Sequence, residues 1–257
     1  MGRFTKLEFG DRDGLIIEPR AEDIGPDAFC LKAEREYQEG NFDNALRFYS
    51  RALEMDKLLF AAWRRQVWCL IELEEYSEAA LWADKALDLF PDDAELLASK
   101  SMAVCRNGRP DEALKVADLA IRQPSAGPYP WIARGEVLLA TRTGRYDYCF
   151  SKAICVVGPS WHVFTEIGRS CQFHGLHSLA IRYFARALEC EPGIIFVMLE
   201  TARCQVKLGL SPQAARVVRE VLAIRPGHRE AQALLTSIES QSVGAGVKGL
   251  FLRLLGR

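Results

Sequence analysis

A repeat of about 34 residues runs through most of this chain of 257 residues and constrains its fold more than any other feature. One position recurs at intervals of 34, 34, 67 and 34 residues: Gly40, Glu74, Gly108, Gly175 and Gly209. An alanine stands five positions later each time: Ala45, Ala79, Ala113, Ala180 and Ala214. A second small or apolar residue follows after seven more: Ala52, Ala86, Ala120, Ala187 and Val221. The interval of 67 leaves room for one further repeat, so the chain holds six copies of one supersecondary unit.

Each repeat is predicted to form two short helices. Trp63 and Val67 have the spacing of one face of a first helix, and Leu46 and Leu53 have that of a second helix. A glycine between them suits the left-handed position that ends the first helix, and an Asp or Ser after it, such as Asp43, is predicted to cap the second. The recurring small residues let the two helix axes approach closely, so the repeats predict an all-α fold.

The fifth repeat carries the residue types of a known helical repeat at nine positions: Phe164, Ile167, Gly168, Cys171, Gly175, Ala180, Phe184, Ala187 and Pro192. On these residues the chain resembles the tetratricopeptide repeat (TPR) family. The resemblance implies a right-handed superhelical solenoid of about six helix-turn-helix repeats, followed by a capping helix. It places the repeats at residues 26–59, 60–93, 94–127, 128–160, 161–194 and 195–228. The cap is expected at 229–241, between an N-terminal arm at 1–25 and a linker with a basic amphipathic segment at 242–257.

The fourth repeat departs from the common pattern. Gly144 comes two residues late, Pro159 comes early, and Cys149 replaces the usual alanine. These shifts predict a longer turn over residues 141–144 and a shorter second helix. The irregularity is either a tolerated change of loop or a hinge that alters the stacking of the fourth and fifth repeats.

The resemblance also implies a peptide-binding groove lined by the first helix of each repeat. The groove positions are occupied by Arg64, Arg65, Trp68, Ser99, Met102, Ile132, Glu136, Arg169 and Arg203. Arginine binds carboxylates and an indole offers stacking area, so Arg64, Arg65 and Trp68 predict a ligand with acidic and apolar residues. The alternative is a solvated face with a half-buried Trp68, and with Arg169 and Arg203 in ion pairs within their own helices.

One known TPR ligand is excluded by the sequence. TPR proteins that bind the acidic tails of heat-shock chaperones use a carboxylate clamp of Lys and Asn residues. Here Cys30 and Glu34 stand at two clamp positions of the first repeat, and Arg65 replaces an Asn of the second. We therefore expect no chaperone-tail binding of that kind.

Catalysis is not expected either, because the chain has no phosphate-binding loop, zinc-protease motif or serine-hydrolase motif. Cys171, His174 and His177 are closely spaced, but three ligands on one short segment rarely complete a metal site. We therefore predict no catalytic residue, cofactor or metal. Three function classes remain. They are a protein-interaction scaffold, an enzyme or enzyme subunit whose active site cannot be recognised from the sequence, and a chaperone-like pilot protein that holds an unfolded segment of a partner.

Composition limits the partners and the location. The formal net charge is −1, which argues against a dedicated nucleic-acid binder. No apolar stretch has membrane-spanning length, the first 20 residues lack the apolar core of a secretion signal, and the eight cysteines form no C-x-x-C pair. These features predict a cytoplasmic protein that binds a protein or peptide ligand.

The last residues form a separate candidate site. An apolar stripe at helical spacing is formed by Val247, Leu250, Phe251, Leu254 and Leu255. The segment also carries Lys248, Arg253 and Arg257 and no acidic residue. Three roles are open: folding back on the cap, docking on a partner, or lying in an anionic membrane interface, which would make the protein membrane-peripheral.

Overall fold

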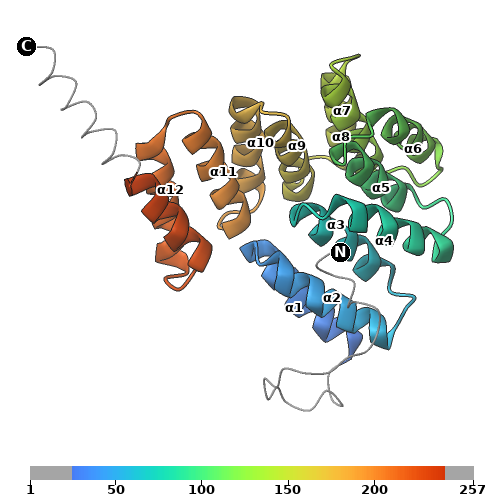
Figure 1. Ribbon diagram of the computed structural model, residues 1–257, viewed down its shortest axis with the longest axis horizontal. Coiled ribbons are helices and arrows are strands. Elements are labelled where there is room, and N and C mark those ends of the chain that lie inside the picture. The colour runs from blue at the N-terminus through green and yellow to red at the C-terminus, as the bar shows by residue number, and fades with distance from the viewer. Residues whose placement is uncertain (1–24, 241–257) are drawn as a thin grey trace, which may run out of the picture. The chain divides into compact units, whose positions relative to one another are not determined.

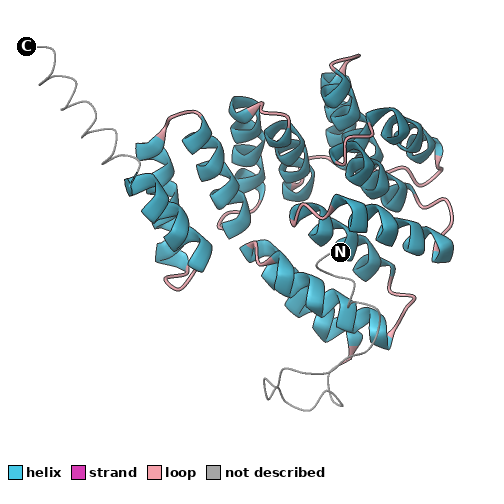
Figure 2. Cartoon of the chain, viewed as in Figure 1, coloured by secondary structure: helices cyan, strands magenta, loops and turns pink. Residues whose placement is uncertain are grey.

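The computed structural model describes residues 25–240, and in this range it contains helices and no strand (Figures 1 and 2). The predicted all-α helical-repeat fold class is therefore confirmed. The chain divides into two compact units between Val157 and Gly158. We call residues 25–157 the N-terminal unit and residues 158–240 the C-terminal unit, and describe each by itself.

The N-terminal unit holds four helix pairs. Their bounds are α1 (Pro26–Glu39) with α2 (Phe42–Met55), α3 (Phe60–Glu72) with α4 (Tyr76–Leu89), α5 (Ala94–Arg106) with α6 (Pro110–Arg122), and α7 (Pro128–Thr141) with α8 (Tyr146–Val157). Each first helix packs against its own second helix, and the second helix packs against the first helix of the next pair. This is the neighbour-to-neighbour packing of a repeat protein.

The C-terminal unit holds two further pairs and one more helix. The pairs are α9 (Trp161–Phe173) with α10 (His177–Cys190), and α11 (Ile195–Lys207) with α12 (Ser211–Ile224). Residues 229–240 are also helical. Every sequence repeat thus holds one helix pair, and the first helix of each pair starts at the first residue of its repeat.

The turns inside the pairs explain the recurring glycine. Gly40 has φ 84°, and its backbone N–H donates to carbonyl oxygens of the last turn of α1. Glu74 stands at the same repeat position and takes φ 62°, a conformation that is unfavourable for a side chain. The predicted capping role of Asp43 is wrong, because α2 already begins at Phe42 and leaves Asp43 inside its first turn. There its charge still favours the helix N-terminus.

The fourth pair is irregular at its turn. Four residues separate α7 from α8, with Arg142 at φ 54° and Gly144 at φ 67°, and α8 has only 12 residues. The division of the chain into its two units falls directly after α8. The departure from the repeat pattern and the boundary of the compact units therefore lie in the same repeat.

Small residues allow the close approach of the two helices in a pair. The recurring residues are fully buried at Ala45, Ala52, Ala79, Ala86, Ala113, Ala120, Ala180, Ala187 and Ala214. In two pairs a glycine of the first helix faces the ring of a buried phenylalanine in the second. A Cβ atom on Gly135 or Gly168 would lie 2.5 Å from a ring carbon of Phe150 or Phe184, respectively.

The helix at residues 229–240 covers the apolar end of the sixth pair. Ala231 and Ile238 are buried in one cluster with Leu199, Val218 and other residues of α11 and α12. Leu234 and Leu235 are partly buried against this cluster. The helix thus closes the core of the C-terminal unit, as a capping helix does.

Of the predicted N-terminal arm at 1–25, residues 1–24 lie outside the described residues. The predicted segment at 242–257 lies outside them as well, with its stripe of Val247, Leu250, Phe251, Leu254 and Leu255. Among the helices that are described, none has both the length and the apolar character needed to cross a membrane.

Candidate functional site

Arg64, Arg65 and Trp68 lie on α3, in the second pair, and contact residues of the first, third and fourth pairs. Arg64 forms an ion pair with Glu95 of α5, and its guanidinium lies 5.7 Å from the ring centre of Tyr129 on α7. The ring of Trp68 lies 6.0 Å from the same tyrosine ring, and the Trp68 residue is only 3% exposed. Trp68 is therefore a packing residue rather than an open aromatic surface.

Arg65 belongs to a second, partly buried polar cluster. Its Nη2 lies 3.2 Å from Oε1 of Glu34 on α1, and the hydroxyl of Tyr49 donates to the other oxygen of Glu34 at 3.1 Å. Burial, and then the charge of Glu34, raises the pKa of Tyr49, which stays protonated as a donor. Burial acts against the charge of Arg65, but neighbouring groups, Tyr37 and Glu34 first among them, raise its pKa. The Glu34 carboxylate is thus held on both oxygens.

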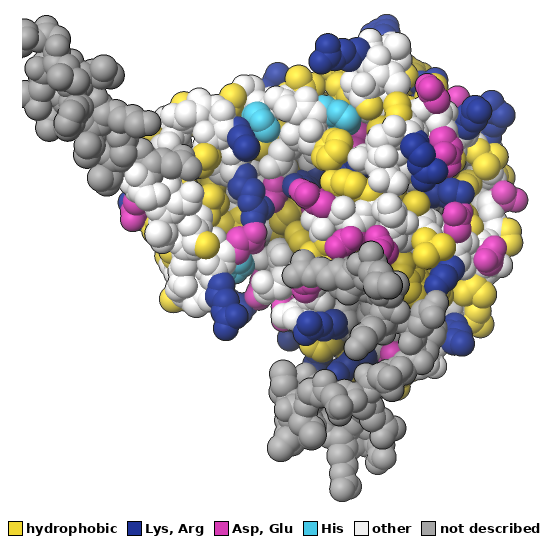
Figure 3. Space-filling model, viewed as in Figure 1, with side chains coloured by type: hydrophobic (Ala, Val, Ile, Leu, Met, Phe, Trp, Pro, Cys, Tyr) yellow, Lys and Arg dark blue, Asp and Glu magenta, His cyan; other side chains and the backbone are white. Residues whose placement is uncertain are grey.

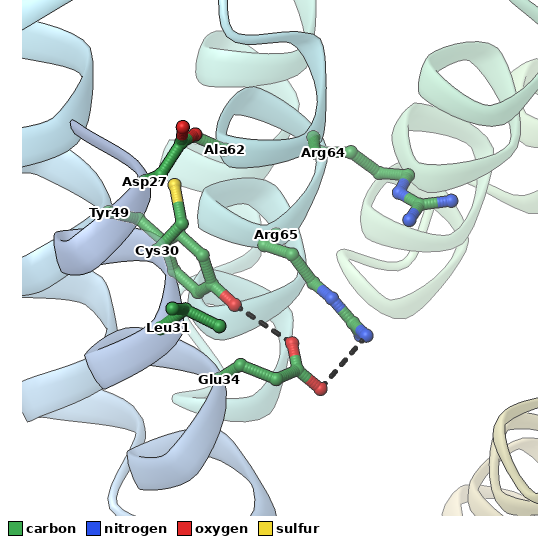
Figure 4. A pocket seen from close by; sticks show the side chains of 9 residues that line it. Asp27, Cys30, Leu31, Glu34, Tyr49, Ala62, Arg64 and Arg65 are labelled. Atoms are coloured by element: carbon green, nitrogen blue, oxygen red, sulfur yellow. Dashed lines mark hydrogen bonds and ion pairs between the residues drawn. The ribbon is translucent and has the colours of Figure 1, made fainter. Parts of the chain in front are cut away.

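A pocket of about 430 Å³ opens beside this cluster, between α1 and α3 (Figure 4). Its lining residues are Asp27, Cys30, Leu31, Glu34, Tyr49, Ala61, Ala62, Arg64 and Arg65. The four residues from α1 follow one another at helical spacing, so they share one face of that helix. On α3 the lining consists of the short side chains of Ala61 and Ala62 and the long side chains of Arg64 and Arg65. In Figure 4, Arg65 points toward Glu34 and Arg64 points away from it.

The predicted groove residues of the third and fourth pairs lie inside the fold. Met102, Ile132, Ser99 and Glu136 are all 0% exposed. The hydroxyl of Ser99 donates to the carbonyl of Glu95 within its own helix, at 2.9 Å. The physical reason for the burial is that α5 packs directly against α7 as well as against α3, so these positions face a neighbouring helix. Their predicted contact with a ligand stays a prediction.

The remaining groove candidates, Arg169 and Arg203, lie in the C-terminal unit and share Glu200. Nη1 of Arg169 lies 2.8 Å from Oε2 of Glu200, and Arg203 pairs with both Glu200 and Glu230. Burial opposes the charge of Glu200, but Arg169 and then Arg203 lower its pKa. Of these three pairs, Arg203–Glu200 lies within one helix, as predicted, whereas Arg169–Glu200 joins α9 to α11 of the next pair.

The sequence contains a regular spacing of opposite charges that matches several of these ion pairs. Residues of opposite charge 31 positions apart form ion pairs between first helices of adjacent repeats: Glu34 with Arg65, Arg64 with Glu95, and Arg169 with Glu200. This spacing is a signal by which the pairing of Glu34 with Arg65 and of Glu95 with Arg64 could have been predicted. No sequence motif indicated a site at Asp27, Leu31 or Tyr49. Acidic and basic side chains also intermix on the molecular face that Figure 3 displays.

The comparisons with known proteins agree with this architecture. A family model described as "Tetratricopeptide repeat" matches residues 30–94. Protein unc-45 homolog B of Xenopus laevis is 33% identical over 94 residues, which are 35% of this chain. The match spans about a tenth (10%) of the length of that curated relative.

A solved structure shows the same fold. A thermophilic TPR protein of Thermus thermophilus aligns with 71% of this chain and 100% of its own, at 18% identity and a TM-score of 0.53. Repeated helix pairs, the small residues at their crossings, the family model and this structure lead to one conclusion. The chain has the helical-repeat fold of tetratricopeptide-repeat proteins, and its residues 30–94 match the model of that family.

Proposed function

We propose that the chain is a non-catalytic scaffold that binds a peptide or helix of a partner protein in the pocket between α1 and α3. TPR repeats generally serve as protein-interaction scaffolds, and the pocket is the observation that carries the proposal for this chain. It lies on the first helices, where the family resemblance implies a ligand.

The pocket has the properties of a peptide subsite. Its lining combines Leu31, which is 66% exposed, and the exposed Ala61 with the polar cluster of Glu34, Tyr49 and Arg65. Because that cluster is held by hydrogen bonds, its side chains are already fixed before a ligand arrives, which lowers the entropy cost of binding.

Affinity capture with the full chain tests this function. Leu31→Glu places a charge in the pocket, whereas Leu58→Glu is a matched control at a leucine that is 70% exposed and does not line the pocket. We expect specific partners to be lost with Leu31→Glu and retained with Leu58→Glu. Partners that remain bound to both variants at full yield would overturn the assignment of the pocket.

The alternative is a peripheral membrane-associated adaptor or a chaperone-like pilot that uses residues 242–257. The observation that favours it is the apolar stripe with three cations and no acid in the last 11 residues. Flotation with anionic liposomes separates the two functions. A full chain with Lys248→Glu, Arg253→Glu and Arg257→Glu should stop floating if these cations bind the membrane, and equal recovery of both forms would remove this alternative.

A further inference from the structure

The cations of the α1–α3 pocket are already neutralised within the fold. The Arg65 side chain is 14% exposed and is paired with Glu34, and Arg64 is paired with Glu95. A ligand carboxylate at either arginine would have to displace a carboxylate that the fold already positions. The acidic ligand that the sequence predicted would therefore gain little affinity from these two arginines.

The open part of the pocket is instead apolar and negative. Leu31 and Ala61 are exposed, Cys30 is half-buried, and the exposed Asp27 has no ion-pair partner among the described residues. Burial, and then the charge of Asp27, raises the pKa of Cys30, so this thiol is neutral and acts as part of the apolar wall. Glu34, Arg65 and Arg64 each have an ion-pair partner, so among the described lining residues Asp27 is the one charge without such a partner.

We propose that this pocket binds a peptide segment in which aliphatic or aromatic side chains stand next to a Lys or Arg. The inference rests on the proposed function and assigns the chemistry of its ligand. The apolar side chain packs against Leu31 and the exposed Ala61, and the cation lies near the exposed Asp27. Charge complementarity selects this ligand over an acidic one.

The net charge of the N-terminal unit also favours a cationic ligand. Residues 25–157 contain 17 Lys or Arg and 21 Asp or Glu, a net charge of −4. A cationic segment is therefore attracted toward the N-terminal unit before it reaches the pocket, and the attraction weakens with salt.

The chain itself supplies a suitable probe for the test. A fluorescein-labelled peptide of residues 247–257 has five apolar residues on one helical face and three cations. Its matched control has Glu at the positions of Lys248, Arg253 and Arg257. The receptor is the full chain with those same three positions changed to Glu, because its own terminal segment could otherwise compete with the probe.

Fluorescence anisotropy at low salt should show the cationic peptide binding at least tenfold more tightly than its Glu counterpart. In the receptor, Leu31→Ser should weaken binding of the cationic peptide about tenfold, because it removes apolar contact area without adding a charge. Asp27→Asn should weaken it about threefold, as expected for one exposed charge. Leu58→Ser, at an exposed leucine that does not line the pocket, should leave the affinity unchanged. Binding should also weaken as salt rises.

Three results would overturn the inference: equal or tighter binding of the Glu peptide, no binding of either peptide, or losses that are equal for Leu31→Ser and Leu58→Ser. The proposed function is judged separately by partner capture. If partners depend on Leu31 but their bound segments lack Lys and Arg, the function stands and this ligand chemistry fails.

Discussion

Arg106 at the end of α5 and Glu136 in the middle of α7 form a two-point ion pair inside the N-terminal unit. Nε of Arg106 lies 2.7 Å from one carboxylate oxygen of Glu136, and Nη2 lies 3.1 Å from the other. The side chains are 1% and 0% exposed. The third and fourth helix pairs are thus joined by a fully desolvated charge pair, at a position where the repeat pattern suggested a groove residue.

Removal of one partner of this pair should be costly. In Arg106→Met the Glu136 carboxylate loses its counter-charge inside the protein, and we expect the free energy of unfolding to fall by about 3–5 kcal/mol. The double variant Arg106→Met, Glu136→Met should recover most of that loss, because no charge is left buried. Urea unfolding followed by circular dichroism measures both, and a loss below about 1 kcal/mol for the single variant would contradict the role of the pair.

The glycine that faces Phe184 should not tolerate a side chain. Alanine is the better helix former by about 1 kcal/mol, but the Cβ of Gly168→Ala would press on a buried ring. We expect a net loss of about 1–2 kcal/mol and faster hydrogen exchange in α9 and α10. Gly227→Ala, in the turn after α12, is the control for a glycine-to-alanine change in the same unit, because no atom lies within 4 Å of its added Cβ. A gain in stability for Gly168→Ala would mean that the ring moves aside freely.

When the native chain is alkylated at about pH 7.5, the exposed cysteines should react faster than the buried ones. Cys155 and Cys190 are exposed and should react first, whereas Cys105 and Cys204 are buried. Burial, and then Glu136 or Glu200, raises the pKa of Cys105 and Cys204 to about 12, so they stay as unreactive thiols. Mass spectrometry of tryptic peptides measures the extent of labelling. Rapid labelling of Cys204 in the native chain would mean that the C-terminal unit opens readily.

The stability of the C-terminal unit should fall in acid through Glu200. Arg169 and Arg203 lower the pKa of this carboxyl in the folded chain, so the unfolded chain binds its proton more readily. Its contribution is complete above the unfolded pKa of about 4.3 and is lost as the pH falls through the lower folded value. Thermal unfolding at about pH 7 and about pH 3 should show a smaller drop for Glu200→Gln than for the unchanged chain. The same drop in both would place the acid sensitivity in other carboxyls.

The helix pairs and their small crossing residues could be predicted from the chain alone. A position such as Ala180 or Gly168 acts mainly through its own size and its place in a 34-residue period, and neither property requires knowledge of the neighbours. The departure of the fourth repeat was also visible, because Gly144 breaks a local spacing.

The sequence alone could not predict which charges form ion pairs, or how exposed the first-helix residues are. Glu34 and Arg65 are 31 residues apart, and Glu136 is buried only because α5 and α7 pack together. An arginine in a repeat pattern looks the same whether it is free for a ligand or held by a glutamate of the next repeat. Burial and ion pairing depend on which surfaces meet in space, and that is a property of the assembled helices rather than of any single repeat.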